Sequence, residues 1–353
     1  MMGLPGSGKT TYANKLKTYM NNCLLISSDD LREELFGFRD QTRNKELFEE
    51  LNRRVLEHSD KGDCIYDATS LNKEDRRNIV NTFKNKYNLK IIFLVSPVLH
   101  ILQVNFDRHG TEQYVPKEAL RNMFGKIEMP TYDEGWSEIT FIKNNESISS
   151  ADFININTIM EWLPSLPHDN PHHKETIKEH IYRTMQLAQH YFIDIPDLYT
   201  IAKYHDLGKF FVRAYNEDKG YFQYIGHSNL SAYIYLTNYL NKVNITSVVE
   251  KILVPNNINV TPITEKILIP RFFFMYYAIL YHDRFYTFAS KEEVIKNLSQ
   301  PKKSLIKVFE SFEEDPEYNF NQLILTLQRF NKIDREASQT ELIDYHYQAS
   351  IYL

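Results

Sequence analysis

The sequence predicts an α/β domain over residues 1–150, with a parallel sheet and helices on both faces, followed by an all-α domain over residues 151–353. A chain of 353 residues is about twice as long as an ordinary domain, so two cores are expected. In residues 1–140 short apolar runs alternate with amphipathic, charged segments, which is typical of buried parallel strands between helices. From Lys174 onward the segments are long and helix-periodic, which indicates an all-helical second domain.

Three strands and three helices are expected in the first domain. Each strand is a short apolar run that is followed by polar residues, as in a buried parallel sheet. The predicted strands are Leu24–Ser27, Asp63–Asp67 and Lys90–Ser96. The predicted helices begin after Lys9 and cover Arg43–His58 and Asn72–Tyr87.

The domain boundary is expected near residues 150–160. The polar segment Lys143–Ser150 and the Pro-containing segment Leu163–Pro167 interrupt the regular pattern there. Beyond this boundary, the Asn-rich segment Pro255–Val260 divides the second domain into separate groups of helices.

Composition excludes several classes of protein. Hydrophobic residues make up 42% of the chain and charged residues 25%, which is near the globular average and excludes a mostly disordered chain. The net charge of −5 argues against broad coating of nucleic acid, although a local basic groove could still hold one strand end. Without a long apolar run or a leader before Gly3, we expect a cytoplasmic protein that does not bind membranes.

A glycine-rich octapeptide near the start carries the clearest chemical signal. Gly3–Thr10 (GLPGSGKT) fits the pattern G-x-x-x-x-G-K-[ST], whose backbone N–H groups point at phosphate oxygens where a helix begins. Lys9 would reach the β- and γ-phosphates, and the Thr10 hydroxyl would hold Mg²⁺. A plain Gly-rich turn is the alternative, but an amphipathic helix follows directly. ATP and Mg²⁺ are therefore expected, bound by Gly3, Gly6, Ser7, Gly8, Lys9, Thr10 and Thr11.

A loop of this kind follows a central buried strand, yet only Met1 and Met2 precede Gly3. Either the true start lies upstream or the sheet is completed in an unusual way, and we favour an upstream start. Extending the chain at this end is then expected to raise its stability and its ATP affinity.

Charged residues that follow the predicted strands are candidates for the rest of this site. Asp29 lies just beyond a strand and can act as a general base, while Arg32 can hold an acceptor phosphate. The same segment is equally typical of a helix N-terminus with acidic residues in its first turn. Asp67 ends the next strand, where it can support hydrated Mg²⁺. Arg108 can clamp phosphates from a lid, although a lone arginine is more often a surface residue.

This ordered set resembles the kinase domain of phage and bacterial 5′-hydroxyl polynucleotide kinases over residues 1–140. The matching motifs are Gly3–Thr10, Asp29-Asp30-x-Arg32, Asp67-Ala68-Thr69 with Leu71-Asn72, and the stretch from Arg108 to Pro116. The resemblance implies that Lys9 and Thr10 serve ATP and Mg²⁺. Asp29 would be the general base for the 5′-hydroxyl, Arg32 would hold the acceptor's 3′-side phosphate, and Arg108 would clamp the donor phosphates. Lids of this family commonly carry more arginine.

The second domain contains histidines and aspartates in an order that indicates a metal site. His205 and Asp206 are adjacent and can direct an imidazole and a carboxylate at one cation. His180 and Asp283 are expected to arrive from neighbouring helices, and Lys209 to hold a phosphate. Such a mixed set suits a divalent transition metal such as Mn²⁺, Co²⁺ or Ni²⁺. Any one of these histidines alone is more often a core or surface residue, so the argument depends on their combination.

The combination resembles the HD phosphohydrolase superfamily, and over residues 165–290 it is close to the HD domain attached to bacterial tRNA nucleotidyltransferases. The resemblance implies four metal ligands: His180, His205, Asp206 and Asp283. His227 would be a substrate-side acid or a ligand of a second metal. Two-metal members often carry a further histidine where this chain has Val254–Asn257, so one ion is expected. The boundary histidines, expected to be solvated or capping residues, are His168, His172 and His173.

A 5′ kinase joined to a metal-dependent phosphohydrolase would convert broken RNA ends into ligatable ones. Fusions of two such modules are known in bacterial and phage end-repair proteins, so the resemblance implies RNA or DNA strand ends as substrates and a separate ligase in the pathway. Two alternatives stay open. One is a small-molecule or nucleoside kinase fused to a nucleotide phosphohydrolase, and the other is a non-catalytic nucleotide-binding sensor.

Overall fold

The computed structural model divides the chain into two compact units. It describes residues 1–37, 42–144, 160–161, 165–169, 171, 173–242, 260–264, 270–287, 291–311 and 315–339. The first unit comprises Met1–Ile159 together with Tyr233–Phe273, and the second comprises Met160–Ala232 together with Phe274–Leu353. A segment from the second half of the chain therefore belongs to the first unit, in addition to the residues before the predicted boundary.

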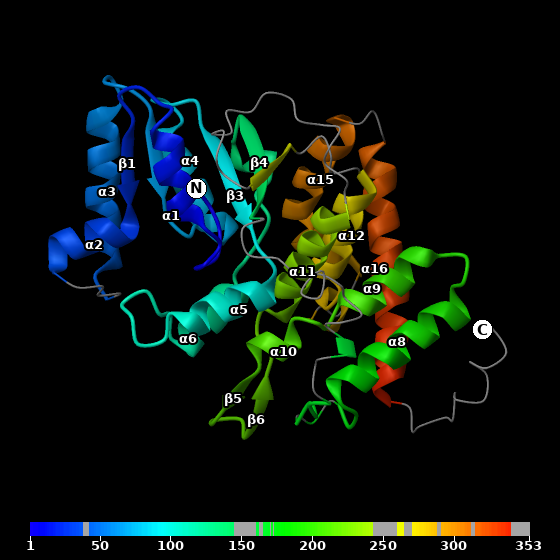
Figure 1. Ribbon diagram of the computed structural model, residues 1–353. Helices are drawn as coiled ribbons and strands as arrows, with labels where there is room; N and C mark the ends of the chain where they lie inside the picture. The colour runs from blue at the N-terminus through cyan, green and yellow to red at the C-terminus, as the bar shows by residue number, and fades with distance from the viewer. Residues whose placement is uncertain are drawn as a thin grey trace. The chain divides into compact units, whose positions relative to one another are not determined.

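The first unit alternates strands and helices, as the sequence pattern predicts (Figure 1). Its strands are β1 (Leu24–Ser27), β2 (Cys64–Asp67), β3 (Lys90–Val95), β4 (Glu138–Asn144) and β7 (Val260–Thr264). Its helices are α1 (Lys9–Lys17), α2 (Ser28–Phe36), α3 (Asn44–His58), α4 (Lys73–Phe83), α5 (Val98–Asp107), α6 (Lys117–Phe124) and the 3-10 turn η1 (Tyr132–Glu134). The three predicted strands and the three predicted helices are confirmed to within a few residues at their ends.

The strands of this unit form two sheets. β1 pairs with β2 in parallel, and β3 pairs with β4 in parallel, as expected of an α/β fold. β7 adds an antiparallel edge to β4, with Phe141 opposite Ile263. Tyr233, in the helix α11 (His227–Lys242), accepts a hydrogen bond from the Ser96 amide and donates one to its carbonyl oxygen, at 3.1 and 2.7 Å. Both of these additions come from the segment after residue 232.

The second unit is mostly helical. It contains α8 (Ile177–Tyr191), α9 (Pro196–Tyr204), α10 (Lys209–Val212), the beginning of α11, most of α12 (Pro270–Leu280), α13 (Arg284–Thr287), α14 (Lys291–Asn297), α15 (Ser299–Ser311) and α16 (Pro316–Gln339). It also contains a hairpin of β5 (Ala214–Asn216) and β6 (Tyr221–Gln223), so the expectation of a purely helical domain is corrected. The turn of this hairpin ends at Gly220, whose φ of 72° suits glycine.

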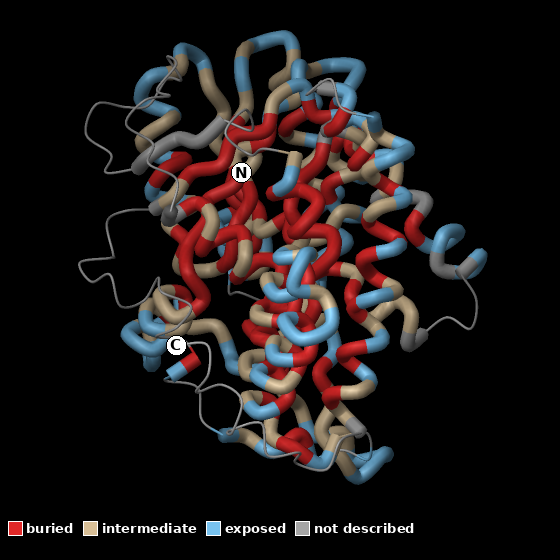
Figure 2. The backbone as a smooth tube through the Cα atoms, turned by 90° about the vertical axis from the view of Figure 1, so that its right-hand side faces the viewer, coloured by how far each residue is buried: buried red, intermediate tan, exposed pale blue. Residues whose placement is uncertain are grey.

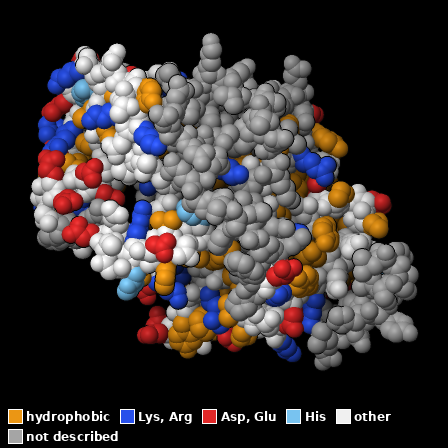
Figure 3. Space-filling model, viewed as in Figure 1, with side chains coloured by type: hydrophobic (Ala, Val, Ile, Leu, Met, Phe, Trp, Pro, Cys, Tyr) orange, Lys and Arg blue, Asp and Glu red, His pale blue; other side chains and the backbone are white. Residues whose placement is uncertain are grey.

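Along several helices in Figure 2, buried stretches alternate with exposed ones. Residues Phe272–Leu280 of α12 are buried at every position, as expected of a helix that is apolar on all sides. Acidic and basic side chains are interspersed on the face that Figure 3 presents. On α3, for example, Arg53 pairs with Glu50 and Glu57. Exposed pairs of this kind contribute little to stability.

A buried ion pair joins α4 to η1 in the first unit. Arg76 of α4 has no exposed surface, and its Nε and Nη2 each donate to the Glu134 carboxylate at 2.8 Å. Its Nη1 donates to the carbonyl oxygens of Leu71 and Glu128, at 2.9 and 3.0 Å. The Trp136 indole also donates to Glu134, at 2.8 Å. One guanidinium therefore holds α4 and η1 together without leaving its charge unpaired.

Replacing Arg76 with Met is expected to lower the free energy of unfolding by about 3–5 kcal/mol, because the Glu134 carboxylate would stay buried without its partner. Urea denaturation measures the change. The control is Arg53→Met, because the exposed Arg53 guanidinium should change the free energy of unfolding far less. Equal effects of the two substitutions would contradict this view of the buried pair.

Candidate functional site

The phosphate-loop motif lies at the beginning of α1. Gly8 is the N-cap of this helix and has a φ of 89°. Gly6 has a φ of 81°, and a Cβ at this position would come within 3.0 Å of Val104 Cγ1 on α5. Both the backbone conformation and the close neighbour therefore require glycine at residue 6. The loop has the left-handed turns that let successive N–H groups face a phosphate.

The residues expected around the phosphates and Mg²⁺ lie close together. Thr10 Oγ1 donates to Asp67 Oδ2 at 2.9 Å. Asp67 Oδ1 is buried and has no hydrogen-bond partner among the described residues. Burial lowers the pKa of Lys9, the carboxylates of Asp67 and Asp29 oppose this shift, and Arg108 adds to it. Asp67, Asp29 and Arg108 are therefore all close enough to Lys9 to influence its charge. Thr11, the next residue after Thr10 on α1, is exposed.

Asp29 and Arg32 form an ion pair at the start of α2. Arg32 Nη1 lies 3.0 Å from Asp29 Oδ1, and Nη2 donates to Asn44 Oδ1 at 2.9 Å. The Arg32 side chain is buried, whereas 59% of the Asp29 side chain is exposed. Ser27 caps the helix by accepting hydrogen bonds from the N–H groups of Asp29 and Asp30. The segment is thus a capped helix N-terminus that also presents a largely exposed carboxylate, so the two interpretations of the sequence are compatible.

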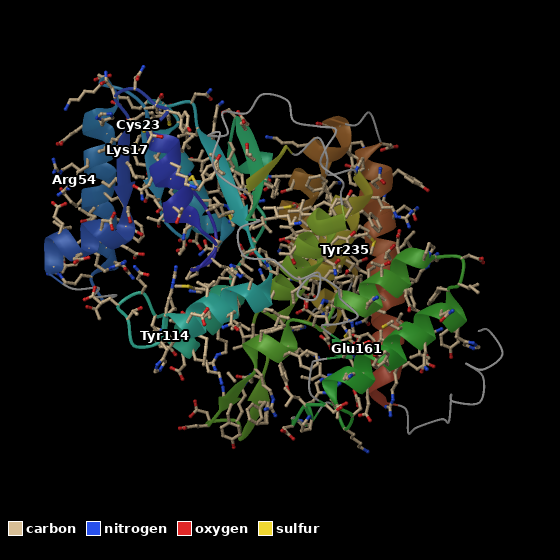
Figure 4. The ribbon with its side chains drawn as sticks, viewed as in Figure 1. Lys17, Cys23, Arg54, Tyr114, Glu161 and Tyr235 are labelled. Carbon is tan, nitrogen blue, oxygen red and sulfur yellow. The ribbon has the colours of Figure 1, made fainter. Side chains whose placement is uncertain are left out.

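Arg108 ends α5 and begins a loop that Asn105 ties back to the helix. Asn105 Nδ2 donates to the Val115 carbonyl oxygen, and Asn105 Oδ1 accepts from the Val115 amide, each at 2.9 Å. Within the loop, His109 packs edge-on against Tyr114 with ring centroids 5.0 Å apart, and Figure 4 labels Tyr114 there. A single Asn inside a helix belongs to no recognisable motif, so the sequence did not predict these hydrogen bonds between Asn105 and Val115.

In the second unit, four side chains converge from three parts of the chain. His180 comes from α8, His205 and Asp206 directly follow α9, and Asp334 comes from α16. His180 Nε2 lies 2.8 Å from Asp334 Oδ1 and 3.5 Å from Asp206 Oδ2. His205 Nε2 lies 3.2 Å from Asp206 Oδ2 and 3.5 Å from Asp334 Oδ1. All four residues are buried, and three of them are the predicted ligands.

Asp334 occupies the place in this group that the sequence analysis assigned to Asp283. Ligand atoms of His180, His205 and Asp206 lie within 4.8 Å of one another, and Asp283 is not among the residues of this group in the described part of the chain. Asp283 exerts an electrostatic influence on His227 and His282 that acts to raise the pKa of both imidazoles. The distances favour Asp334 as the second carboxylate of the group, and the role of Asp283 as a ligand stays a prediction.

Asp206 also faces a second pair of histidines. Its Oδ1 lies 3.3 Å from His227 Nε2 and 3.8 Å from His282 Nε2, and the two Nε2 atoms are 3.3 Å apart. The expectation of one ion depended on Val254–Asn257, which lies outside the described residues, whereas His282 supplies the further imidazole from the end of α12. The described side chains therefore offer two ligand sets that share Asp206.

Hydrogen bonds fix the orientation of these imidazoles. Nδ1 of His205, His227 and His282 each bonds to the carbonyl oxygen three residues earlier. The acceptors are Ala202 (2.8 Å), Tyr224 (2.9 Å) and Ile279 (2.7 Å), respectively. Because a carbonyl only accepts, Nδ1 carries a proton in each of these rings, and Nε2 is the nitrogen that a metal could bind. His180 Nδ1 instead lies 3.1 Å from Glu175 Oε1. Inward-directed Nε2 atoms whose Nδ1 is held by a carbonyl oxygen, as in His205, His227 and His282, are typical of metal-ligating histidines.

The charges of the cluster fit a divalent cation. Burial acts to lower the pKa of His205, but Asp206 and Asp334 outweigh burial and raise this pKa to about 10. Burial lowers the pKa of His227 to about 4, against the influence of Asp206. Neither Asp206 oxygen nor His205 Nε2 makes a hydrogen bond of good geometry with the described residues. A cation would satisfy these buried atoms, and the mixed N/O set suits Mn²⁺, Co²⁺ or Ni²⁺.

Lys209 and two further histidines lie next to this cluster. Lys209 Nζ is 2.7 Å from Asp206 Oδ2 and 3.4 Å from His168 Nε2. The His168 ring stacks on His173 with centroids 4.0 Å apart. His168 has no exposed surface, so the prediction of a solvated residue is wrong for it, and His172 lies outside the described residues.

The comparisons with known proteins concern the first unit. Residues 1–130 match the AAA domain family, and this range includes the loop Gly3–Thr10, Asp29, Asp67 and Arg108. Together with the loop geometry, the match supports a P-loop kinase-like domain that binds a nucleotide, with ATP and Mg²⁺ as its expected ligands. No curated protein matches the chain.

No helix in the described part of the chain combines the length and the apolar character that a membrane-spanning segment needs.

Replacing Asp334 with Asn is expected to lower the affinity for Mn²⁺ by about 100-fold, because Asp334 Oδ1 lies 2.8 Å from His180 Nε2 and 3.5 Å from His205 Nε2. Asp283→Asn is the matched control and should change the affinity less than about threefold. Isothermal titration calorimetry, with metal content after dialysis as a second measurement, gives the result. Loss of metal from the Asp283 variant alone would restore the assignment made from the sequence.

Proposed function

We propose that this protein is a bifunctional nucleic-acid end-healing enzyme. It phosphorylates 5′-hydroxyl ends with ATP and removes 2′,3′-cyclic or 3′ phosphate in a metal-dependent reaction, with RNA as the preferred strand. The observation that carries the proposal is the presence, in one chain, of a phosphate loop with Asp29 nearby and a buried histidine and aspartate cluster with Lys209 beside it.

In the kinase reaction, the 5′-hydroxyl oxygen attacks the γ-phosphorus of ATP, the bond to the β,γ-bridging oxygen breaks, and ADP leaves. Asp29 accepts the hydroxyl proton. Its exposed carboxylate suits contact with a macromolecular acceptor, and its electrostatic influence on Lys9 agrees with a location near the phosphates. Lys9 and Arg108 offset the negative charge of the transferring group.

Arg32 fits the role of acceptor-phosphate ligand. Its side chain is buried, and its Nε has no hydrogen-bond partner among the described residues. A phosphate oxygen of the strand would satisfy this N–H, while Nη1 and Nη2 keep their contacts with Asp29 and Asn44. The guanidinium would thus connect the position of the strand with the position of the general base.

In the phosphohydrolase reaction, a water oxygen adds to the phosphorus and the bond from phosphorus to a ribose oxygen breaks. For a 2′,3′-cyclic phosphate this gives a monophosphate, and a second water gives a diol and inorganic phosphate. The four inward Nε2 atoms with Asp206 and Asp334 would hold the metal, which supplies Lewis-acid activation of phosphate and water when bound. Lys209 orients a phosphate oxygen, and of the two roles expected for His227 the proposal assigns that of metal ligand, so the attacking water supplies the proton that the leaving ribose oxygen takes up.

Single substitutions should separate the two activities. Lys9→Ala and Asp29→Ala are each expected to lower 5′ phosphorylation by at least about 100-fold and to leave 3′ processing intact. Asp206→Ala is expected to abolish 3′ processing and to leave 5′ phosphorylation intact. Transfer of label from γ-labelled ATP to a 5′-hydroxyl RNA, and phosphate release from a 2′,3′-cyclic-phosphate RNA with Mn²⁺, measure the two reactions.

The kinase assay also tests nucleosides and a DNA oligomer of matched sequence as phosphate acceptors. A wild-type protein that labels a nucleoside but no oligomer would support a small-molecule kinase instead. A protein that binds ATP without transferring phosphate to any of these acceptors would support a nucleotide sensor.

A further inference from the structure

His168 is a buried histidine that has no role in the two reactions proposed above. It has no exposed surface, and it lies in the segment before α8, outside both ligand sets that share Asp206. Polar side chains that are fully buried almost always have hydrogen-bond partners. The contacts of His168 therefore indicate what this side chain does.

Burial and one hydrogen bond determine the protonation of the His168 ring. Its Nδ1 lies 2.8 Å from the Glu175 carbonyl oxygen, and a carbonyl oxygen only accepts, so Nδ1 carries a proton. Burial lowers the pKa of His168 to about 3, and the charge of Lys209 adds to this shift, so the ring is neutral at neutral pH. A neutral ring with its proton on Nδ1 keeps a lone pair on Nε2, which is therefore a hydrogen-bond acceptor.

Lys209 supplies the donor for this lone pair. Its Nζ lies 3.4 Å from His168 Nε2 and 2.7 Å from Asp206 Oδ2. Only 9% of the Lys209 side chain is exposed, so the ammonium group is largely shielded from water and needs acceptors from the protein. The ring of Tyr224, with its centre 5.6 Å from Nζ, also favours a cation at this place. Of the two acceptors, Asp206 belongs to both ligand sets and His168 to neither.

Neighbouring groups hold the His168 ring in place. The His173 ring stacks on it, with centroids 4.0 Å apart and an angle of 13° between the ring planes. His173 Nδ1 in turn lies 2.8 Å from Glu175 Oε1, so the residue whose carbonyl orients His168 also holds the stacked ring. The Tyr224 hydroxyl donates to the His168 carbonyl oxygen at 2.6 Å. The acceptor nitrogen is thus fixed by a connected network of hydrogen bonds and a ring contact.

His168, His173 and Glu175 also have the side-chain types of a metal site, with ligand atoms within 4.8 Å of one another. The atoms that would bind a metal have other partners, however. Nδ1 of both histidines bonds to Glu175, and His168 Nε2 faces an ammonium group that would repel a cation. The geometry therefore favours a support for Lys209 over a third ligand set.

We propose that His168 is a positioning residue for Lys209 in the phosphohydrolase reaction, an inference that rests on the proposed function. A cation bound to Asp206 would repel the Lys209 ammonium group. The neutral Nε2 of His168 gives this group an acceptor that does not compete with the metal. The ammonium group thereby stays next to the cluster, where it can bind a phosphate oxygen. His168 acts through Lys209 and does not itself bind the metal.

Nitrogen NMR of protein with isotopically labelled histidines tests the contact without metal, phosphate or enzymatic activity. The signals of His168 are assigned as those that His168→Gln removes. We expect Nε2 to resonate as an unprotonated nitrogen and to shift in Lys209→Met, whose side chain donates no hydrogen bond. A proton on Nε2, or His168 signals that Lys209→Met leaves unchanged, would overturn the proposal.

The affinity for inorganic phosphate tests the role of the contact. Calorimetric titration of the Mn²⁺-loaded protein is expected to show an affinity about tenfold lower for His168→Phe, which keeps a stacked ring but removes the acceptor. His168→Gln, whose amide oxygen can accept from Lys209, should recover most of this loss. The control is His190→Phe, which removes an exposed histidine of the same unit and should leave the affinity unchanged.

A double substitution separates positioning from a purely structural effect. In Lys209→Met protein, adding His168→Phe should change the phosphate affinity by less than about twofold, because the residue through which His168 acts is absent. Equal losses with and without Lys209 would overturn the proposal, since they would indicate a structural effect. A wild-type protein that binds Mn²⁺ but no phosphate would instead overturn the proposed function and with it this role, and the NMR result would still show whether the contact exists.

Discussion

The Asp206 carboxylate organises the second unit. Its Oδ2 faces His180, His205 and Lys209, and its Oδ1 faces His227 and His282. A fully buried carboxylate is costly unless it is surrounded by donors or cations, so the helices that carry these side chains must meet at this point. The need to compensate one buried charge therefore determines how α8, α9, α11 and α12 present their side chains.

In the first unit, backbone N–H groups and ion pairs stabilise buried charge. Its phosphate loop relies on backbone N–H groups, and the glycine at residue 6 makes room for α5. Lys9 is the one cation inside the loop motif, and carboxylates from two other segments oppose the effect of burial on its pKa. The Arg76 and Glu134 pair lies at the base of the same fold, where a guanidinium ties α4 to η1. The charged groups described here thus either surround the phosphate loop or hold α4 and η1 together.

The sequence predicted the parts of the fold that are encoded in contiguous residues. A short stretch of sequence was enough to predict the motif Gly3–Thr10, the strand Leu24–Ser27 and the pair of His205 and Asp206. Asp334 could not be found in this way, because a single aspartate in a long amphipathic helix is no motif and its partner His180 is 154 residues away. His282 stands beside Asp283 in the sequence, and nothing local shows that its imidazole faces Asp206. The antiparallel pairing of β7 with β4 could not be predicted either, because the two strands are far apart in the sequence.

The most direct test of the account treats one RNA with two unhealed ends, a 5′-hydroxyl and a 2′,3′-cyclic phosphate, with purified protein, ATP and Mn²⁺. Mass spectrometry of the product then gives the chemical state of both termini. The account predicts a gain of one phosphoryl group at the 5′ end and, in the same sample, opening or loss of the 3′-terminal phosphate. An RNA whose termini are both unchanged, while the protein binds ATP and Mn²⁺, would contradict it.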